Sequence, residues 1–217
     1  MLVNPLNNIK QFWIAFEGIS GCGKSTIIKE VFSVLDPLIG PIKIITEKTH
    51  PILQNNVFSN NNLNSTIPKE YLVYYWWLAR RSNLDYLKKI NCNCILYDRY
   101  YDSTYVYGPI TSLDDIKYNF SNIFQMPDVT FYLRLKDLNV AFNRNSLEYS
   151  DPYEAIDLEK LKYYQKRYDD LYLNSSYRTA NIHFIDAQES ISNITSTIID
   201  ILKNKYHIMD KNFFNNI

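Results

Sequence analysis

A glycine-rich segment near the N-terminus has the composition and spacing of a phosphate-binding loop. Residues 18–25 read Gly-Ile-Ser-Gly-Cys-Gly-Lys-Ser and match the pattern G-x-x-x-x-G-K-[ST] in full. Glycines let successive backbone N–H groups point at phosphate oxygens. Lys24 would bring a positive charge to the β- and γ-phosphates of a nucleoside triphosphate, and the Ser25 hydroxyl would bind Mg²⁺. The residues predicted here to contact ATP are Gly18, Gly21, Gly23, Lys24, Ser25 and Thr26.

Two charged residues, Asp98 and Arg99, directly follow the apolar run 94–97. Ligands of parallel α/β sheets bind at the carboxyl ends of the strands. An acidic and a basic side chain buried there without partners would be costly, whereas Mg²⁺ and phosphates would compensate both. We therefore expect the pair beside the phosphates. The alternative is an ion pair on a surface loop.

Short apolar runs alternate with helical patterns along the chain. Strands are predicted at 12–16, 42–45, 94–97, 129–135 and 182–185. Helices are predicted at 24–35, 69–90, 156–173 and 191–202, with a further one starting at 138–143. We expect the first helix to stop before Pro37. The alternation predicts an α/β fold of the P-loop NTPase type, a three-layer sandwich with a five-stranded parallel sheet flanked by helices.

Length and composition restrict the class of protein further. The 217 residues suffice for one domain, 1–217. Formal net charge is zero, which argues against a polymeric nucleic acid as partner. There is no secretory signal pattern, and no apolar run has the length of a membrane span.

The three cysteines, Cys22, Cys92 and Cys94, favour reduced thiols in a cytoplasmic protein, because their number is odd. Cys92 and Cys94 could also be half of a zinc site. That alternative needs two further ligands at suitable spacing, and the three histidines are scattered.

An ordered set of short motifs resembles the thymidylate kinase family, from Phe12 to about Leu202. Phe16-Glu17-Gly18 leads into the loop as it does in that family. The family pattern D-R-[YH]-x-x-S-x-x-x-[YF] is matched by Asp98, Arg99, Tyr100, Ser103 and Tyr107. The other matching segments are Trp77-Leu78-Ala79-Arg80-Arg81, Pro127-Asp128-Val129-Thr130-Phe131-Tyr132-Leu133, Asp151-Pro152-Tyr153-Glu154 and Ile185-Asp186-Ala187.

The resemblance implies transfer of the γ-phosphoryl group of ATP to thymidine monophosphate (dTMP), with Lys24, Asp98 and Arg99 as catalytic residues. Ser25 and Asp98 would hold Mg²⁺, and Arg99 would bridge the donor and acceptor phosphates. Arg144 would lie against the adenine, at the start of a short lid at about 144–154. Homodimers are typical of the family, so a homodimer is expected.

The resemblance also implies where the acceptor binds. Trp77 would stack on the thymine ring and Arg81 would hydrogen-bond it. Being four residues apart on one predicted helix, they share a face. Trp77 could equally be a core residue. The full predicted acceptor site is Ser20, Glu47, Lys48, Trp77, Arg81, Arg99, Ser103, Tyr107 and Tyr153.

Several positions depart from the family pattern. Ser20 stands where an acidic residue usually contacts the acceptor 3′-hydroxyl, and Lys48 stands in for a missing arginine after the second strand. Gly21 and Pro152 occupy the two positions that can supply a catalytic arginine. Two alternatives therefore stay open. One is a deoxynucleoside kinase with Glu47 as base for the 5′-hydroxyl, and the other is a catalytically weakened nucleotide-binding homologue.

Overall fold

A five-stranded, all-parallel sheet forms the centre of the computed structural model, which describes residues 11–46, 87, 90–108, 126–147, 157–173 and 181–210. The strands are β1 (Phe12–Glu17), β2 (Ile42–Thr46), β3 (Cys94–Asp98), β4 (Val129–Arg134) and β5 (Ile182–Asp186). Their order in the sheet is β2-β3-β1-β4-β5. The predicted five parallel strands are confirmed for this part of the chain.

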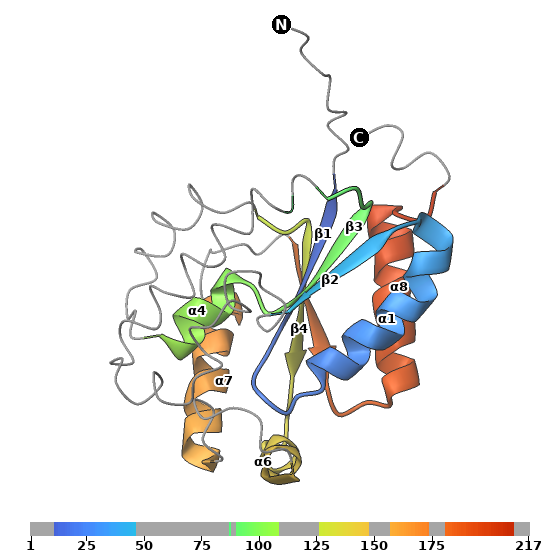
Figure 1. Cartoon of the computed structure of the whole chain (residues 1–217). Helices are drawn as coiled ribbons and strands as arrows, with labels where there is room; N and C mark the ends of the chain where they lie inside the picture. The colour runs from blue at the N-terminus through green and yellow to red at the C-terminus, as the bar shows by residue number, and fades with distance from the viewer. Residues whose placement is uncertain are drawn as a thin grey trace, which may run out of the picture.

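Helices cover both faces of the sheet. The helices of the described residues are α1 (Lys24–Ile39), α4 (Tyr101–Tyr107), α6 (Asn139–Leu147), α7 (Leu158–Leu173) and α8 (Ile191–Tyr206). In Figure 1, α1 and α8 lie together on one side of the sheet, and α4 and α7 lie on the other. This is the predicted three-layer sandwich. Within the described parts of the chain, no helix combines the length and apolarity needed to cross a membrane.

The central strand β1 is buried along its whole length. It pairs with β3 on one side and β4 on the other, and a strand covered on both faces reads as a continuous apolar run. Phe16 packs on Phe131 of β4, with ring centroids 5.6 Å apart. At the start of the strand, the Asp128 carboxylate accepts the Trp13 N–H at 2.7 Å, and the Asp128 N–H donates to the Trp13 carbonyl at 2.8 Å. These contacts fix the register of β1 against β4.

The two helical layers pack on the sheet with different side chains. The side with α1 and α8 is aliphatic, with buried Ile27, Val31 and Leu35 on α1. The side with α4 and α7 is aromatic, since the Tyr132 ring of β4 lies 5.3 Å from Tyr168 on α7. Aromatic packing here brings hydroxyl groups into the interior.

Helix α1 continues past the point where the sequence predicted its end. The expectation that it stops before Pro37 is wrong, because the helix includes Pro37 and ends at Ile39. A proline removes one backbone hydrogen bond and crowds the carbonyl four residues before it, but here only two helical residues follow it. The next turn is secured by the Gly40 N–H, which donates to the Asp36 carbonyl at 3.3 Å, and by the Asp36 carboxylate, which accepts the Ile42 N–H at 3.2 Å.

Two predicted elements lie mostly outside the described residues. Of the predicted helix at 69–90, only Leu87, which is helical and buried, and Ile90 are described. Of the predicted lid, residues 144–147 form the end of α6.

Gly18 offers a test of how tightly the first turn after β1 packs on β4. Its φ is +145°, and a Cβ there would lie 2.5 Å from the Leu133 carbonyl oxygen. We expect Gly18→Ala to lower the free energy of unfolding by about 3 kcal/mol, measured by urea denaturation.

Gly23→Ala is the matched control. Its φ is also positive, at +96°, but an added Cβ would meet nothing nearer than Arg144 Nη1 at 3.7 Å. The free energy of unfolding of this variant should fall only by the cost of the strained backbone, about 1–2 kcal/mol. Equal losses for both variants would contradict the predicted clash.

Candidate active site

The glycine-rich segment forms the turn from β1 into α1, with Gly23 as the residue before the helix. The Lys24 side chain is 6% exposed and folds back over this turn. Its Nζ donates to the Gly18 carbonyl at 3.0 Å and to the Ile19 carbonyl at 2.9 Å. The lysine ammonium therefore lies within the loop, next to the N-terminus of α1, where an anion is stabilised by free N–H groups.

Ser25 and Asp98, the two predicted metal ligands, are in direct contact. The Ser25 hydroxyl donates to Asp98 Oδ2 at 2.6 Å. A hydroxyl and a carboxylate are the oxygen ligands that Mg²⁺ prefers, and Mg²⁺ commonly uses few protein ligands together with phosphates and water. Over the described ranges there is no cluster of three or more His, Cys, Asp or Glu that could hold a metal ion. The pair fits Mg²⁺ bound with a nucleotide.

Arg99 lies between the phosphate loop and α4. Its backbone is left-handed, with φ of +69°, and its N–H donates to the Phe16 carbonyl at 3.1 Å. Nη1 donates to the Gly18 carbonyl at 3.3 Å, and the guanidinium carbon lies 4.6 Å from the centroid of the Tyr107 ring. Lys24 and Arg99 thus donate to the same carbonyl oxygen. Two cations held this close favour a polyanion between or beside them.

A buried carboxylate, Glu17, lies at the end of β1 and was not assigned a role from the sequence. It is fully buried. Oε1 accepts the Tyr100 N–H at 2.7 Å, and Oε2 accepts the Ser103 hydroxyl at 2.6 Å and the Tyr168 hydroxyl at 2.9 Å. Burial, and second the nearby Asp102 carboxylate, raise the pKa of Glu17 to about 7. The signal in the sequence was an acidic residue ending a wholly apolar strand.

Ser103 and Tyr107, two predicted acceptor residues, lie on α4 close to Arg99. Ser103 is 2% exposed and its hydroxyl is engaged with Glu17 and Tyr168. The Tyr107 ring lies against the Arg99 guanidinium. Their contact with an acceptor stays a prediction.

Arg144, the residue predicted to contact adenine, approaches the loop from α6. Its Nη1 donates to the Gly21 carbonyl at 3.1 Å. In the same loop Ser20 is partly buried, and Thr26 is exposed in the first turn of α1. The remaining predicted site residues lie outside the described residues: Glu47, Lys48, Trp77, Arg81 and Tyr153.

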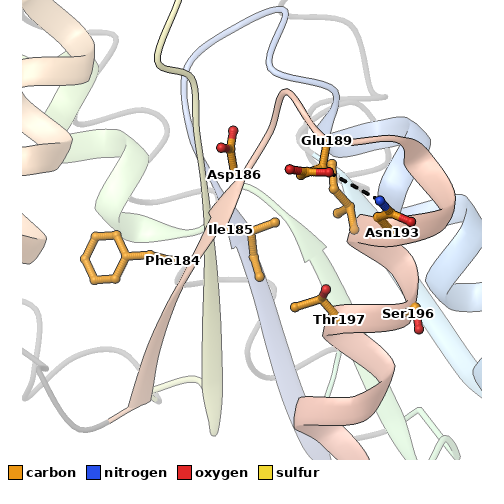
Figure 2. Close-up of a pocket in the computed structure, with 8 residues that line it drawn as sticks. Phe184, Ile185, Asp186, Glu189, Asn193, Ser196 and Thr197 are labelled. Atoms are coloured by element: carbon orange, nitrogen blue, oxygen red, sulfur yellow. Dashed lines mark hydrogen bonds between the residues drawn. The ribbon is translucent and has the colours of Figure 1, made fainter.

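A separate groove lies between edge strand β5 and α8, with Phe184, Asp186 and Asn193 among its lining residues (Figure 2). Strand β4 separates β5 from β1 and its loop. Asp186 is paired with Lys136 at 2.6 Å, and Glu189 accepts Asn193 Nδ2 at 3.3 Å. Both carboxylates thus interact with neighbouring side chains, and neither is linked to the loop by these contacts.

The geometry defines a P-loop nucleotide-binding protein of the kinase type. A glycine loop follows the central strand, a lysine and a serine open the next helix, and an Asp-Arg pair meets them from the neighbouring strand. The carboxyl ends of parallel strands meet at this edge, where such proteins bind their ligands.

The chain belongs to the thymidylate kinase family, whose sequence model, described as thymidylate kinase, matches residues 16–198. A probable thymidylate kinase from Sulfolobus acidocaldarius is 31% identical over 187 residues, covering 84% of this chain and 92% of that protein. A thymidylate kinase from Mycoplasma mobile is 26% identical over 216 residues, covering 87% of this chain and 96% of that protein. The family assigned from the short motifs is confirmed, and the chain is a kinase.

Solved structures share the fold. A deoxyadenosine kinase from M. mycoides aligns with a TM-score of 0.66 and 21% identity, covering 89% of this chain and all of that one. A thymidylate kinase from Ehrlichia chaffeensis aligns with a TM-score of 0.64 and 18% identity, covering 88% of this chain and 98% of that one. At these identities the likeness establishes the architecture and leaves the acceptor to other arguments.

The raised pKa of Glu17 predicts an unusual dependence of stability on pH. A carboxyl whose pKa rises from 4.5 to about 7 on folding binds its proton more tightly in the folded state. The contribution of Glu17 to the free energy of unfolding is therefore most favourable below pH 4.5. It is lost as the pH rises toward 7, by on the order of 3 kcal/mol. We expect Glu17→Gln, which cannot ionise, to gain stability relative to the wild type between pH 5 and pH 8.

The measurement is the free energy of unfolding in urea at both pH values. Tyr168→Phe is the control, because it removes one hydrogen bond to Glu17 and leaves the carboxyl able to titrate. That variant should keep the pH dependence of the wild type. Parallel pH curves for the wild type and Glu17→Gln would show that Glu17 does not titrate in this range.

Proposed function

We propose that the chain transfers the γ-phosphoryl group of ATP to dTMP, giving dTDP, with Mg²⁺ bound alongside ATP. The observation that carries the proposal is the convergence of Lys24 and Arg99 on the Gly18 carbonyl, at 3.0 and 3.3 Å. One cation comes from the phosphate loop and the other from the strand beside it. An acceptor that brings its own phosphate supplies the second anion that this arrangement favours.

Each residue has a distinct part in the proposed reaction. Phosphoryl transfer depends on positioning and on stabilising charge that spreads over the phosphate oxygens. Lys24 would bind the β- and γ-phosphate oxygens, and Arg99 would contact both the transferring group and the acceptor phosphate. Ser25 and Asp98 would hold Mg²⁺, which supplies further positive charge to the phosphates when bound.

The acceptor is tested by a coupled assay of ADP release with ATP, Mg²⁺ and a panel of thymidine, dTMP, dUMP, dGMP and dCMP. We expect dTMP to give the highest kcat/KM. We also expect Arg99→Ala to lower kcat/KM for dTMP by on the order of 10²–10³-fold, because the arginine would stabilise charge in the transition state.

Thymidine is the internal control, because it lacks the phosphate that Arg99 would contact. If thymidine exceeds dTMP in this panel and Glu47→Gln abolishes its use, the protein is a nucleoside kinase. If Lys24→Ala turned over at the rate of the wild type, the proposed P-loop mechanism would be wrong.

Arg144 is expected to serve ATP binding rather than the chemical step. Its guanidinium donates to the carbonyl of Gly21, whereas Lys24 and Arg99 both donate to the carbonyl of Gly18. An interaction made equally in the ground and transition states changes KM and spares kcat. Arg144→Ala should therefore raise KM for ATP several-fold at saturating acceptor, with kcat preserved. A collapse of kcat with KM unchanged would make Arg144 the catalytic arginine.

The proposal includes a homodimer, which the resemblance to the family supports. Size-exclusion chromatography with light scattering tests it directly. A monomer at assay concentrations that still turns over dTMP would remove this part and leave the activity intact.

A further inference from the structure

We propose that Glu17 is a positioning residue, which holds Arg99 in place through the backbone of Tyr100 and through α4. The proposed mechanism gives Glu17 no contact with a nucleotide. It is nevertheless a fully buried acidic residue directly before the phosphate loop. Burying a carboxylate costs free energy, and an apolar side chain of similar size would avoid that cost. The presence of Glu17 is explained if its hydrogen bonds do something that an apolar side chain cannot do.

The first link runs through the backbone on either side of Arg99. The Arg99 N–H donates to the Phe16 carbonyl at 3.1 Å, and the Tyr100 N–H donates to Glu17 Oε1 at 2.7 Å. These two consecutive N–H groups flank the rotatable bonds of Arg99. The left-handed φ of +69° is disfavoured for a residue with a side chain. The hydrogen bonds from the Arg99 and Tyr100 N–H groups to β1 hold the turn in this conformation.

The second link runs through α4 to the ring that supports the guanidinium. Glu17 Oε2 accepts the Ser103 hydroxyl at 2.6 Å. Ser103 and Tyr107 are four residues apart on α4, so they share a face of the helix. The Tyr107 ring lies 4.6 Å from the guanidinium carbon of Arg99. The same carboxylate therefore fixes the turn that directs Arg99 and the helix that carries its aromatic support.

The chemistry of the carboxylate suits this double task. One oxygen serves the turn after β3, and the other serves α4 and, through the Tyr168 hydroxyl at 2.9 Å, α7. An apolar side chain of the same size could fill the space and could not accept the Tyr100 N–H. The inference rests on the proposed function to the extent that Arg99 acts on the acceptor phosphate.

The test compares three variants with the wild-type protein by steady-state kinetics. Glu17→Ala removes both links, and we expect a loss of kcat/KM for dTMP on the order of 10²-fold, because small displacements of a positioned group have effects of this size. KM for ATP should change little, since Lys24 has its own contacts to the loop. A merely structural defect would affect both substrates alike.

Glu17→Gln and Tyr168→Phe are the matched controls. Glutamine retains a carbonyl oxygen for the Tyr100 N–H, while the hydroxyls of Ser103 and Tyr168 can turn to accept from its amide. Its kcat/KM should stay within a few-fold of the wild type. Tyr168→Phe removes a buried hydrogen bond to the same carboxylate and leaves both links to Arg99, so it should lower the melting temperature and spare kcat/KM. A Glu17→Gln variant as impaired as Glu17→Ala would overturn the inference.

A double-mutant cycle shows whether Glu17 acts through Arg99. Dissociation constants for dTMP are measured by calorimetry for Glu17→Ala, Arg99→Ala and the double variant. If Glu17 works by placing Arg99, its replacement has no further effect once Arg99 is absent. Additive losses would overturn the inference. Should Glu17→Ala fail to fold, Glu17→Asp replaces it, because the shorter side chain withdraws its carboxylate from Tyr100 and keeps the charge.

The two proposals fail in different ways. If dTMP is not the acceptor, the wild type itself shows no preference for it, and the cycle is repeated with whichever acceptor the panel favours. If Glu17 has no positioning role, Glu17→Ala retains the activity of the wild type on that acceptor. A crystal structure of Glu17→Ala with the φ of Arg99 and its contact to Gly18 unchanged would overturn the inference without any assay.

Discussion

The parallel pairing of β1 with β3 determines where the charged groups of this protein meet. In this register Phe16 is opposite Asp98, so the phosphate loop and the Asp98-Arg99 turn leave the sheet at the same level. The Ser25 hydroxyl reaches Asp98 at 2.6 Å, and the Arg99 guanidinium reaches Gly18 at 3.3 Å. A slip of one residue would reverse the faces of the strand and separate these groups. The site therefore depends on the pairing of the central strands.

Cationic and acidic side chains lie close together at this edge. The Lys24 and Arg99 cations point at one carbonyl oxygen, while the buried carboxylates of Glu17 and Asp102 lie on the side of α4. Burying a carboxylate is costly unless hydrogen bonds compensate it. Glu17 receives three of them, from donors on three different segments. Compensation of this kind fixes the relative positions of the segments that supply the donors.

Sequence patterns specified the parts of this site that are local. The glycine loop could be recognised because its chemistry needs residues in one short segment, and the strands could be recognised because each is a short, mainly apolar run between helical patterns. Glu17 could not be assigned in that way, since its donors come from residues 100, 103 and 168. The end of α1 was misplaced because the tolerance of Pro37 depends on the Asp36 contacts that close the next turn. The contacts of Trp77 and Arg81 with an acceptor remain predictions from resemblance.

The aromatic layer of the fold explains why so many tyrosines are compatible with a buried acidic cluster. Three tyrosine hydroxyls in this layer donate to carboxylates: Tyr168 to Glu17, Tyr172 to Asp102 and Tyr132 to Asp169, at 2.9, 2.8 and 2.9 Å. A tyrosine buries a large apolar ring and still presents a donor at its tip. The rings thus pack α7 on the sheet, while the hydroxyls donate hydrogen bonds to nearby carboxylates. Two of these acids, Glu17 at the end of β1 and Asp102 on α4, lie close to the Arg99 turn, so the tyrosines that pack this layer also supply hydrogen bonds to the acids beside that turn.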